Sequence, residues 1–356
     1  MTPKFHTLTI DNIRKETEDT VSIAFEIPTE LEKDYSFHAG QYLTLKSTIE
    51  GEEIRRSYSL SSSPLENEWR VAIKKIEGGK FSTYANEYFS EGQFIEVMTP
   101  TGHFQLNSSP LNKKSYVLIA AGSGITPIIS IAKTVLKEEP ESNVTLFYGN
   151  KNFVSIIFRE EIEALKNIFM NRLTVIHILS RESLGNEIQK GRIDAEKIKQ
   201  LHQAYLLNTT IDDIFVCGPE EMIHSVKDYF IDHVKDVKNI HFELFNTASV
   251  KKYTTIKDAN EPLVAANVQV IIDGDALDFA LSSDGESILD AATKAGGDLP
   301  FACKGGVCCT CKAKIIEGTA SMDINYALEP DEVAAGYILT CQAHPTSEKL
   351  IISFDE

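Results

Sequence analysis

Four of the six cysteines place the strongest constraint on what this chain can fold into. Cys303, Cys308 and Cys311 are separated by four and two residues, and Cys341 follows after a longer gap. Three thiols in one tight loop and a fourth from further along the chain is the spacing that holds a two-iron, two-sulfur cluster. Zinc is the alternative for clustered cysteines, but zinc sites usually come as paired knuckles. We therefore predict an iron–sulfur loop.

The residues between these cysteines fit the same interpretation. Gly305 and Gly306 let the backbone curl around inorganic sulfide and direct amide groups at it. Cys309 lies inside the loop but outside the ligand spacing, so we interpret it as a small packing residue, with a spare ligand as the alternative. Structural disulfides are not expected in a cytosolic protein.

The segment from about Val268 onward resembles a plant-type ferredoxin. The resemblance rests on the block LPFACKGGVCCTCKAKIIEG and the later GYILTCQA. It implies a β-grasp ferredoxin domain over residues 265–356 and a 2Fe-2S cluster. The implied ligands are Cys303, Cys308, Cys311 and Cys341.

Length and composition bound the rest of the chain. A chain of 356 residues exceeds what one hydrophobic core usually organises, so we expect three domains. No apolar run is long enough for a membrane span, and the polar start MTPKFHTLTIDNIRKETEDT has no secretory apolar stretch. We expect a cytoplasmic protein with no membrane partner.

Charge argues against a nucleic-acid partner. The formal net charge is -17, whereas binding phosphate backbones needs a basic surface. Residues 265–356 hold five basic and fifteen acidic residues, so much of the acidity is at the C-terminal end. This surface can dock a basic partner protein, or it can simply keep the protein soluble.

The pattern of polar and apolar residues changes twice along the chain. Residues 1–110 alternate polar and apolar positions in short runs such as QYLTLKS and WRVAIKKI, which predicts an antiparallel β-barrel or sandwich. Over residues 111–246, apolar runs such as YVLIAAG and DIFVCGP alternate with helical stretches, which predicts an α/β domain on a parallel sheet. Residues 247–264 are polar and predict a linker.

Two short motifs in the first domain have the chemistry to bind a flavin. In the first, Arg56 can neutralise a diphosphate, Tyr58 can pack on an aromatic ring, and the serines can donate hydrogen bonds. The second, starting at Gly79, suits a helix start whose free amides hold a pyrophosphate. An isolated RSYS tetrapeptide is more often an ordinary part of a surface strand than a cofactor site. The residues concerned are Arg56, Ser57, Tyr58, Ser59, Gly79, Lys80, Phe81 and Ser82.

A glycine-containing loop opens the second domain after the strand YVLIAAG. Gly122 and Gly124 allow phosphate to approach the backbone, and the following helix offers amide donors and a favourable dipole. The third glycine of the dinucleotide fingerprint is absent, so an ordinary strand-to-helix turn is the alternative.

The two domains together resemble the ferredoxin–NADP reductase family, because these motifs come in the family's order as RxYS, GxxS and GxGxTP. The resemblance implies FAD at the first two motifs and a flavin-facing strand that runs through Ala72, Ile73 and Lys74. It implies a nicotinamide loop that includes Gly122, Gly124, Thr126 and Pro127. It also implies that Ser59 and Cys217 act at the reaction centre, with Gly218 beside Cys217. Cys217 would help to position the hydride path without forming a covalent intermediate, and simple packing at the end of an apolar strand is the alternative for it.

In that family, a Ser-Arg pair matching Ser180 and Arg181 contacts the 2′-phosphate of NADPH. A guanidinium would also favour a phosphate on physical grounds. The resemblance therefore implies NADPH in preference to NADH. An exposed arginine that merely caps a strand end is the alternative.

The domain order resembles that of reductase components of bacterial oxygenases. It implies electron flow from NADPH through FAD and the 2Fe-2S cluster to an oxygenase component that accepts single electrons, here a di-iron oxygenase. The alternatives are a reductase for an aromatic-ring or steroid hydroxylating oxygenase, or a non-catalytic iron–sulfur redox sensor.

Overall fold

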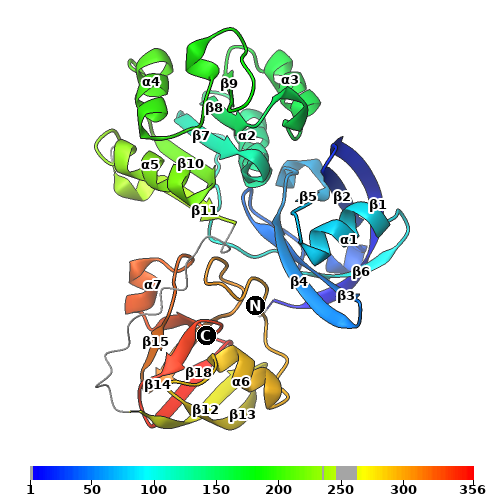
Figure 1. Cartoon of the computed structure of the whole chain (residues 1–356), viewed down its shortest axis with the longest axis vertical. Coiled ribbons are helices and arrows are strands. Elements are labelled where there is room, and N and C mark those ends of the chain that lie inside the picture. Colours follow the sequence, from blue (N-terminus) through cyan, green and yellow to red (C-terminus); the bar gives the residue numbers. More distant parts are fainter. Residues whose placement is uncertain (1–2, 235, 246–262) are drawn as a thin grey trace.

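The computed structural model describes residues 3–234, 236–245 and 263–356. Figure 1 shows three domains that follow one another along the chain. Most of the predicted linker, residues 247–262, lies outside the described residues. Among the described residues, no helix has both the length and the apolar character needed to cross a membrane.

The first domain is a six-stranded antiparallel sheet with the order β4-β3-β6-β1-β2-β5. A bridge between Leu60 and Val71 joins the end of β4 to β5 and closes the sheet, which confirms the predicted barrel. Its interior is a buried apolar cluster that includes Ile23, Leu43 and Val97. The elements are β1 (Phe5–Thr17), β2 (Thr20–Glu26), β3 (Tyr42–Ile49), β4 (Glu52–Ser59), β5 (Trp69–Lys74), β6 (Phe94–Met98) and α1 (Lys80–Tyr88).

The second domain is a parallel sheet with the order β11-β10-β7-β8-β9, as the alternating pattern predicts. Apolar clusters cover both faces of this sheet, which is why its strands are nearly continuous apolar runs. Its strands are β7 (Ser115–Ala121), β8 (Asn143–Asn150), β9 (Leu173–Leu179), β10 (Asp213–Gly218) and β11 (Ile240–Leu244). Its helices are α2 (Ile125–Glu138), α3 (Arg159–Ile168), α4 (Ala195–Tyr205) and α5 (Glu220–Phe230).

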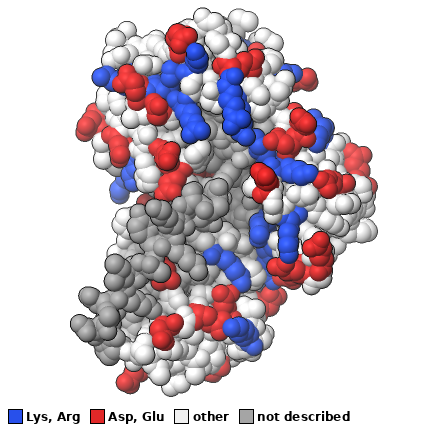
Figure 2. Space-filling view, in the orientation of Figure 1, with Lys and Arg blue, Asp and Glu red and all other residues white. Residues whose placement is uncertain are grey.

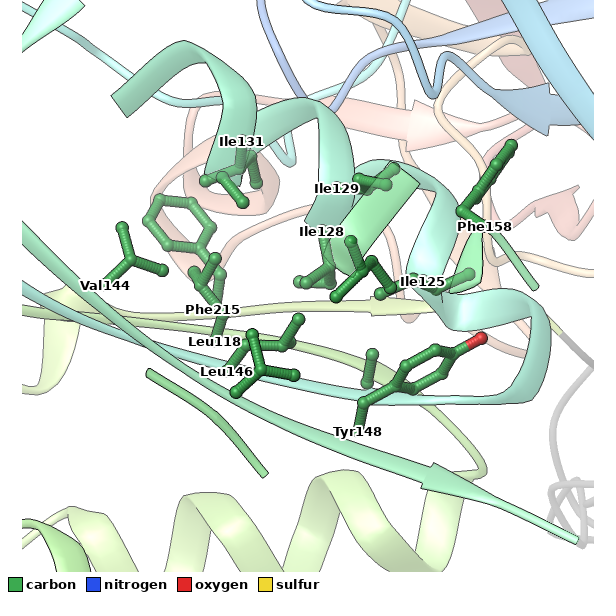
Figure 3. Close-up of a cluster of buried hydrophobic side chains, with 14 of the residues drawn as sticks. Leu118, Ile125, Ile128, Ile129, Ile131, Val144, Leu146, Tyr148, Phe158 and Phe215 are labelled. Atoms are coloured by element: carbon green, nitrogen blue, oxygen red, sulfur yellow. The ribbon is translucent and has the colours of Figure 1, made fainter. Parts of the chain in front are cut away.

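Helix α2 covers one face of this sheet. Figure 3 shows Ile125, Ile128 and Ile131 directed toward side chains of the sheet such as Leu118 and Phe215. Each fully buried isoleucine contributes about 1.5–3 kcal/mol of hydrophobic stabilisation. This packing fixes the helix, and with it the glycine loop at its first turn.

The third domain is a mixed five-stranded sheet with the order β13-β12-β18-β14-β16. Strands β12 and β18 run parallel, whereas β12 and β13 form an antiparallel hairpin. The elements are β12 (Ala265–Ile272), β13 (Asp275–Ser282), α6 (Ile288–Lys294), β14 (Lys312–Glu317), β15 (Ala320–Met322), α7 (Pro330–Ala334), β16 (Tyr337–Leu339), β17 (Ala343–Pro345) and β18 (Lys349–Ser353).

Short 3-10 helices connect several of these elements. They are η1 (Thr29–Leu31), η2 (Pro64–Glu66), η3 (Gly122–Gly124), η4 (Phe153–Ser155), η5 (Glu187–Gln189) and η6 (Val237–Asn239). Two of them matter for function, because η2 follows the first flavin motif and η3 is the glycine loop itself.

Candidate functional site

The four predicted cluster ligands come together in the third domain. Cys308, Cys311 and Cys341 are buried, and Cys303 is half-buried. The Sγ atoms of Cys303 and Cys308 are 3.1 Å apart, and the backbone amide of Gly305 donates to Cys303 Sγ at 3.3 Å. Hydrogen bonds from the thiols of Cys308 and Cys341 and from loop amides lower the pKa of Cys303. At Cys303 this favours the thiolate, which is the form that binds iron, whereas the same contacts raise the pKa of the Cys308 and Cys341 thiols.

The loop's backbone also fits a cluster. Gly306 has a φ of +74°, and a Cβ there would lie 2.8 Å from the carbonyl oxygen of Ile324, so a larger residue would strain the loop. Across the described ranges, no group of three or more His, Cys, Asp or Glu side chains is arranged to hold a metal ion by itself. A two-iron cluster does not need such a group, because its four ligands are shared between two irons.

The first flavin motif lies on β4 at the mouth of the barrel. Tyr58 is half-buried, and its ring centroid is 5.9 Å from that of Phe81 on α1, which brings the two flavin motifs together. Ser57 Oγ is 3.1 Å from Thr44 Oγ1. Arg56 is exposed and donates to the carbonyl of its neighbour Arg55 at 2.7 Å, which leaves most of its guanidinium donors available.

The second flavin motif begins α1 as predicted. Gly79 is the N-cap, and a Cβ there would lie 2.6 Å from Ser82 Oγ and 3.1 Å from the Ile76 carbonyl oxygen, so the turn leaves little space for a larger residue. Phe81 is buried in the core of the barrel, so any part it has in binding comes through its backbone. The Lys80 side chain is paired with Glu52 at 2.7 Å. The N–H groups at the first turn of a helix suit a diphosphate.

A cleft of about 990 Å³ runs along the carboxyl ends of the parallel strands. This is the edge at which α/β sheets bind ligands. Its lining includes these predicted residues: Lys74, Gly122, Gly124, Ser180, Arg181 and Gly218. Thr126 and Pro127 are buried behind the loop, and the Thr126 hydroxyl donates to the Ser123 carbonyl at 3.0 Å.

Three exposed cations line the same cleft: Lys151, Arg181 and Arg192. None of them forms an ion pair within the part of the chain that the structure describes. Figure 2 shows Lys and Arg side chains gathered on this face of the nucleotide domain. Arg181 was predicted from its motif, whereas Lys151 and Arg192 were missed, because their proximity depends on how the ends of β8 and β9 and the segment between η5 and α4 come together.

The glycine loop and Cys217 are in close contact. A Cβ on Gly124 would lie 2.1 Å from the carbonyl oxygen of Cys217, so only glycine allows α2 to start against β10. Burial raises the pKa of the Cys217 thiol well above its ordinary value, which keeps it neutral. A neutral buried thiol can shape an aromatic binding surface, and it is a poor nucleophile.

Glu243 on β11 is a further site residue that was not predicted from the sequence. Ser59 Oγ donates to Glu243 Oε2 at 3.1 Å, which links the flavin motif to the nucleotide domain. Burial raises the Glu243 pKa to about 8, although the Ser59 hydrogen bond opposes the shift. The carboxyl group therefore exchanges a proton near neutral pH. The signal in the sequence was an acidic residue within the apolar strand IHFEL.

The cluster loop is packed directly against the flavin barrel. Tyr42 of β3 is buried beside Ala302 and Cys308, and its hydroxyl lies 2.9 Å from Thr310 Oγ1. Arg55 of β4 is also buried, and its guanidinium donates at 3.3 Å to the Leu299 carbonyl. The pattern of the sequence held no information on this placement.

Arg55 makes two more contacts with the third domain. Its guanidinium lies 3.3 Å from Asp298 Oδ1 and 4.2 Å from the centroid of the Phe301 ring. The nucleotide domain contributes as well, because Tyr326 donates to Glu220 at 3.3 Å. The thiol loop therefore lies where the three domains meet, next to the strands that carry the flavin motif.

Comparison with known protein families assigns the same three parts. Residues 7–106 match the oxidoreductase FAD-binding domain, residues 118–228 the oxidoreductase NAD-binding domain, and residues 270–346 the 2Fe-2S iron-sulfur cluster binding domain. These domains and the geometry above define an electron-transfer oxidoreductase that uses a flavin, a nicotinamide nucleotide and an iron–sulfur cluster.

Two relatives match nearly the whole chain. It is 43% identical to one of the subunits of 1,2-phenylacetyl-CoA epoxidase from Escherichia coli (strain K12), over 99% of this chain and 98% of the relative. It is 32% identical to the ferredoxin reductase component of 3-ketosteroid-9-alpha-monooxygenase from Rhodococcus rhodochrous, over 98% and 96%. The chain belongs to the family of ferredoxin–NADP reductase flavoproteins with a C-terminal plant-type 2Fe-2S domain.

Solved structures support the fold. Phthalate dioxygenase reductase matches with a TM-score of 0.59 at 23% identity, over 98% of both chains. An intact type IV self-sufficient cytochrome P450 monooxygenase matches with a TM-score of 0.70 at 19% identity. This chain spans 41% of that longer P450 chain.

Proposed function

We propose that this protein takes electrons from NADPH and passes them one at a time, through FAD and the 2Fe-2S cluster, to an oxygenase component. The observation that carries the proposal is the Tyr42 to Thr310 contact, which holds the thiol loop against the flavin barrel. Bound FAD can accept a hydride from the nicotinamide and release its two electrons singly to the cluster.

The protein's own residues would support this transfer by binding and orientation. Arg56 and the first turn of α1 would hold the flavin diphosphate, while Tyr58 would pack on the flavin ring. Gly122 and Gly124 would let the nucleotide approach the backbone, and Cys217 would shape the nicotinamide surface. Ser59 and Glu243 would hold a proton beside the flavin ring through their hydrogen bond. Cys303, Cys308, Cys311 and Cys341 would ligate the cluster.

The preference for NADPH over NADH rests on charge. Arg181, Lys151 and Arg192 together offer an unpaired positive surface in the cleft, as far as the described residues go. A 2′-phosphate carries charge that NADH lacks, and a guanidinium can bind it in a bidentate manner. We propose that Ser180 and Arg181 bind this phosphate, assisted by the other two cations.

For the acceptor, we propose the di-iron oxygenase complex of phenylacetyl-CoA epoxidation in phenylacetate degradation. The support is the full-length relation to the epoxidase protein of Escherichia coli. The relation to the 3-ketosteroid-9-alpha-monooxygenase reductase favours a steroid hydroxylating oxygenase as the second candidate. A redox sensor without turnover is the alternative of another class. We also propose a cytoplasmic location and domain bounds of 1–110, 111–246 and 265–356.

The test is an anaerobic titration of the purified holoprotein with NADPH and, separately, with NADH. We expect flavin and iron–sulfur absorbance that bleaches at low NADPH, with a weaker response to NADH. Cofactors that respond to neither nucleotide would contradict the reductase assignment and favour a sensor. Equal responses to both nucleotides would contradict the NADPH preference alone. Adding each purified candidate oxygenase with its substrate then identifies the acceptor by coupled NADPH oxidation.

A further inference from the structure

Helix α2 carries three polar side chains that are buried, although buried positions usually hold apolar residues. Ser130, Lys133 and Thr134 are all at most 3% exposed, although the rest of the buried surface of α2 is mainly aliphatic. Polar groups are buried at a cost unless they find partners, and a buried ammonium costs the most. The groups that these three side chains bind therefore indicate the role of this side of α2.

All three side chains bind one short segment of the flavin domain, residues 61–66. The Ser130 hydroxyl donates to the Ser62 carbonyl at 2.6 Å. Thr134 Oγ1 is 2.8 Å from Ser63 Oγ, and Lys133 Nζ donates to the Ser61 carbonyl at 3.1 Å. We call this set of contacts the α2 seam.

Lys133 is the centre of the α2 seam. Its ammonium lies 3.2 Å from Glu66 Oε2 of the flavin domain and also pairs with Glu161 of α3. Glu66 is fixed in turn, because the Ser63 amide donates to it at 2.9 Å. One buried cation thus connects the flavin domain to two helices of the nucleotide domain.

The α2 seam lies between the two signature motifs. Its flavin-domain side starts at Ser61, two residues after Ser59 at the end of the first flavin motif. Its other side is α2, which begins directly after the glycine loop Gly122–Gly124. Any shift of α2 along residues 61–66 would therefore move the nucleotide loop relative to the flavin motif.

A polar seam controls such a shift better than an apolar one. Hydrogen bonds and ion pairs have narrow geometry, and a buried charge that loses its partner is penalised strongly. Apolar surfaces can slide with little loss, because the hydrophobic effect is not directional. Stability alone would not require a buried lysine here, since a well-packed apolar residue is often as stabilising.

We propose that Lys133 is a positioning residue, which fixes the nicotinamide loop at the distance from the flavin motif that hydride transfer needs. The inference rests on the proposed function and adds a residue remote from the reacting atoms. Lys133 touches neither the cleft nor the first flavin motif, so it acts through α2 and the Ser61 carbonyl.

The experiment compares Lys133→Met with Lys133→Arg in the full-length holoprotein. Stopped-flow absorbance measures flavin reduction at saturating NADPH, and the long-wavelength charge-transfer band reports nicotinamide stacking on the flavin. A misplacement of about 1 Å can cost about a hundredfold in rate, so we expect Lys133→Met to slow flavin reduction by about ten- to a hundredfold and weaken the band. Lys133→Arg, which keeps the charge, should recover most of both.

Lys137→Met is the matched control. Lys137 lies one turn further along the same helix and pairs with the same Glu66 at 2.6 Å, but its side chain is 37% exposed. Exposed pairs contribute little, so flavin reduction should stay within about twofold of wild type. Thermal unfolding and flavin content measure whether each variant folds and keeps its cofactor.

Three outcomes separate the inference from the proposed function on which it rests. A Lys133→Met protein that folds, keeps FAD and reduces it at the wild-type rate with an unchanged band would overturn the positioning role. If Lys133→Met does not fold, Thr134→Val takes its place, because it removes only the hydroxyl that Thr134 contributes to the α2 seam. An unchanged rate and an unchanged band in that variant would overturn the positioning role of the seam. A wild-type protein that no nucleotide reduces would instead contradict the proposed function.

Discussion

Ser59 and Glu243 are joined by a hydrogen bond of 3.1 Å, although they lie 184 residues apart in the chain. Ser59 ends the strand of the first flavin motif, and Glu243 lies on the last strand of the nucleotide sheet. The contact brings a titratable group to the boundary of two domains, at the place where the flavin and nucleotide motifs converge.

The first prediction concerns pH and Glu243. Its folded pKa is raised to about 8 from an ordinary value of 4.5, so the folded state holds a proton that the unfolded state releases between these values. The resulting stability is complete below about pH 4.5 and is lost as the pH rises through 8. As the pH rises from 5 to 8.5, we expect the stability of Glu243→Gln to fall less than that of the wild type, because glutamine cannot lose a proton. Thermal unfolding of the flavin-free proteins measures this difference. Parallel pH profiles for both proteins would contradict this.

The second prediction concerns the cluster ligands. Replacing Cys303 or Cys341 by serine removes a thiolate that we propose as a ligand, so we expect loss of the iron–sulfur absorbance and of bound iron. Flavin reduction by NADPH should remain, while one-electron reduction of an added acceptor should fall steeply. Cys309→Ala is the matched control, since it changes a thiol of the same loop. Iron lost equally from Cys309→Ala would show that Cys309 serves as a ligand.

The third prediction concerns nucleotide choice. Hydrogen bonds to charged groups contribute about 1.5–3 kcal/mol, so Arg181→Gln should raise the KM for NADPH by about ten- to a hundredfold. The KM for NADH should barely change, because NADH has no 2′-phosphate. Steady-state reduction of an artificial dye measures both values. Arg14→Gln, at an exposed arginine on the flavin barrel, is the control. A similar rise for both nucleotides would argue against a 2′-phosphate site.

The fourth prediction concerns the contact between barrel and cluster loop. Arg55 is buried and bound to Asp298 and the Leu299 carbonyl, so Arg55→Gln should loosen the docked third domain. Truncating a buried, paired charge at an interface costs about 2–5 kcal/mol, and we expect cluster reduction after flavin reduction to slow by at least about tenfold. The flavin reduction step itself should be unchanged. Stopped-flow absorbance separates the two steps, and Lys33→Gln, at an exposed lysine elsewhere on the flavin domain, is the control.

The fifth prediction concerns Gly124. A methyl group there would overlap the Cys217 carbonyl, and backbone atoms cannot yield as a flexible side chain does. We expect Gly124→Ala to lower the free energy of unfolding by about 1–3 kcal/mol and to slow flavin reduction. Gly149→Ala is the comparison for stability, since its Cβ would lie 3.2 Å from the end of the Ile193 side chain and 3.6 Å from the nearest backbone atom, the Ala120 carbonyl oxygen. Equal losses in both variants would contradict this explanation.

The sequence alone determined the local chemistry of this protein. The spacing of Cys303, Cys308 and Cys311 predicted a thiol loop, because ligands so close in the chain must share one turn. Alternating and continuous apolar runs distinguished the barrel from the parallel sheet, since each pattern reflects how many faces of a strand are buried. The motifs at Arg56 and Gly122 are similarly local.

Only the tertiary structure decided how these parts meet. Glu243, Lys133, Arg55 and Tyr42 lie in ordinary-looking strands and a helix, and each acts on residues from another domain. Local pattern reports whether a position is buried, but it does not report which distant surface buries it. The contacts of Ser59 with Glu243 and of Tyr42 with Thr310 form because the packing of the three domains against one another places complementary polar groups at their shared boundary.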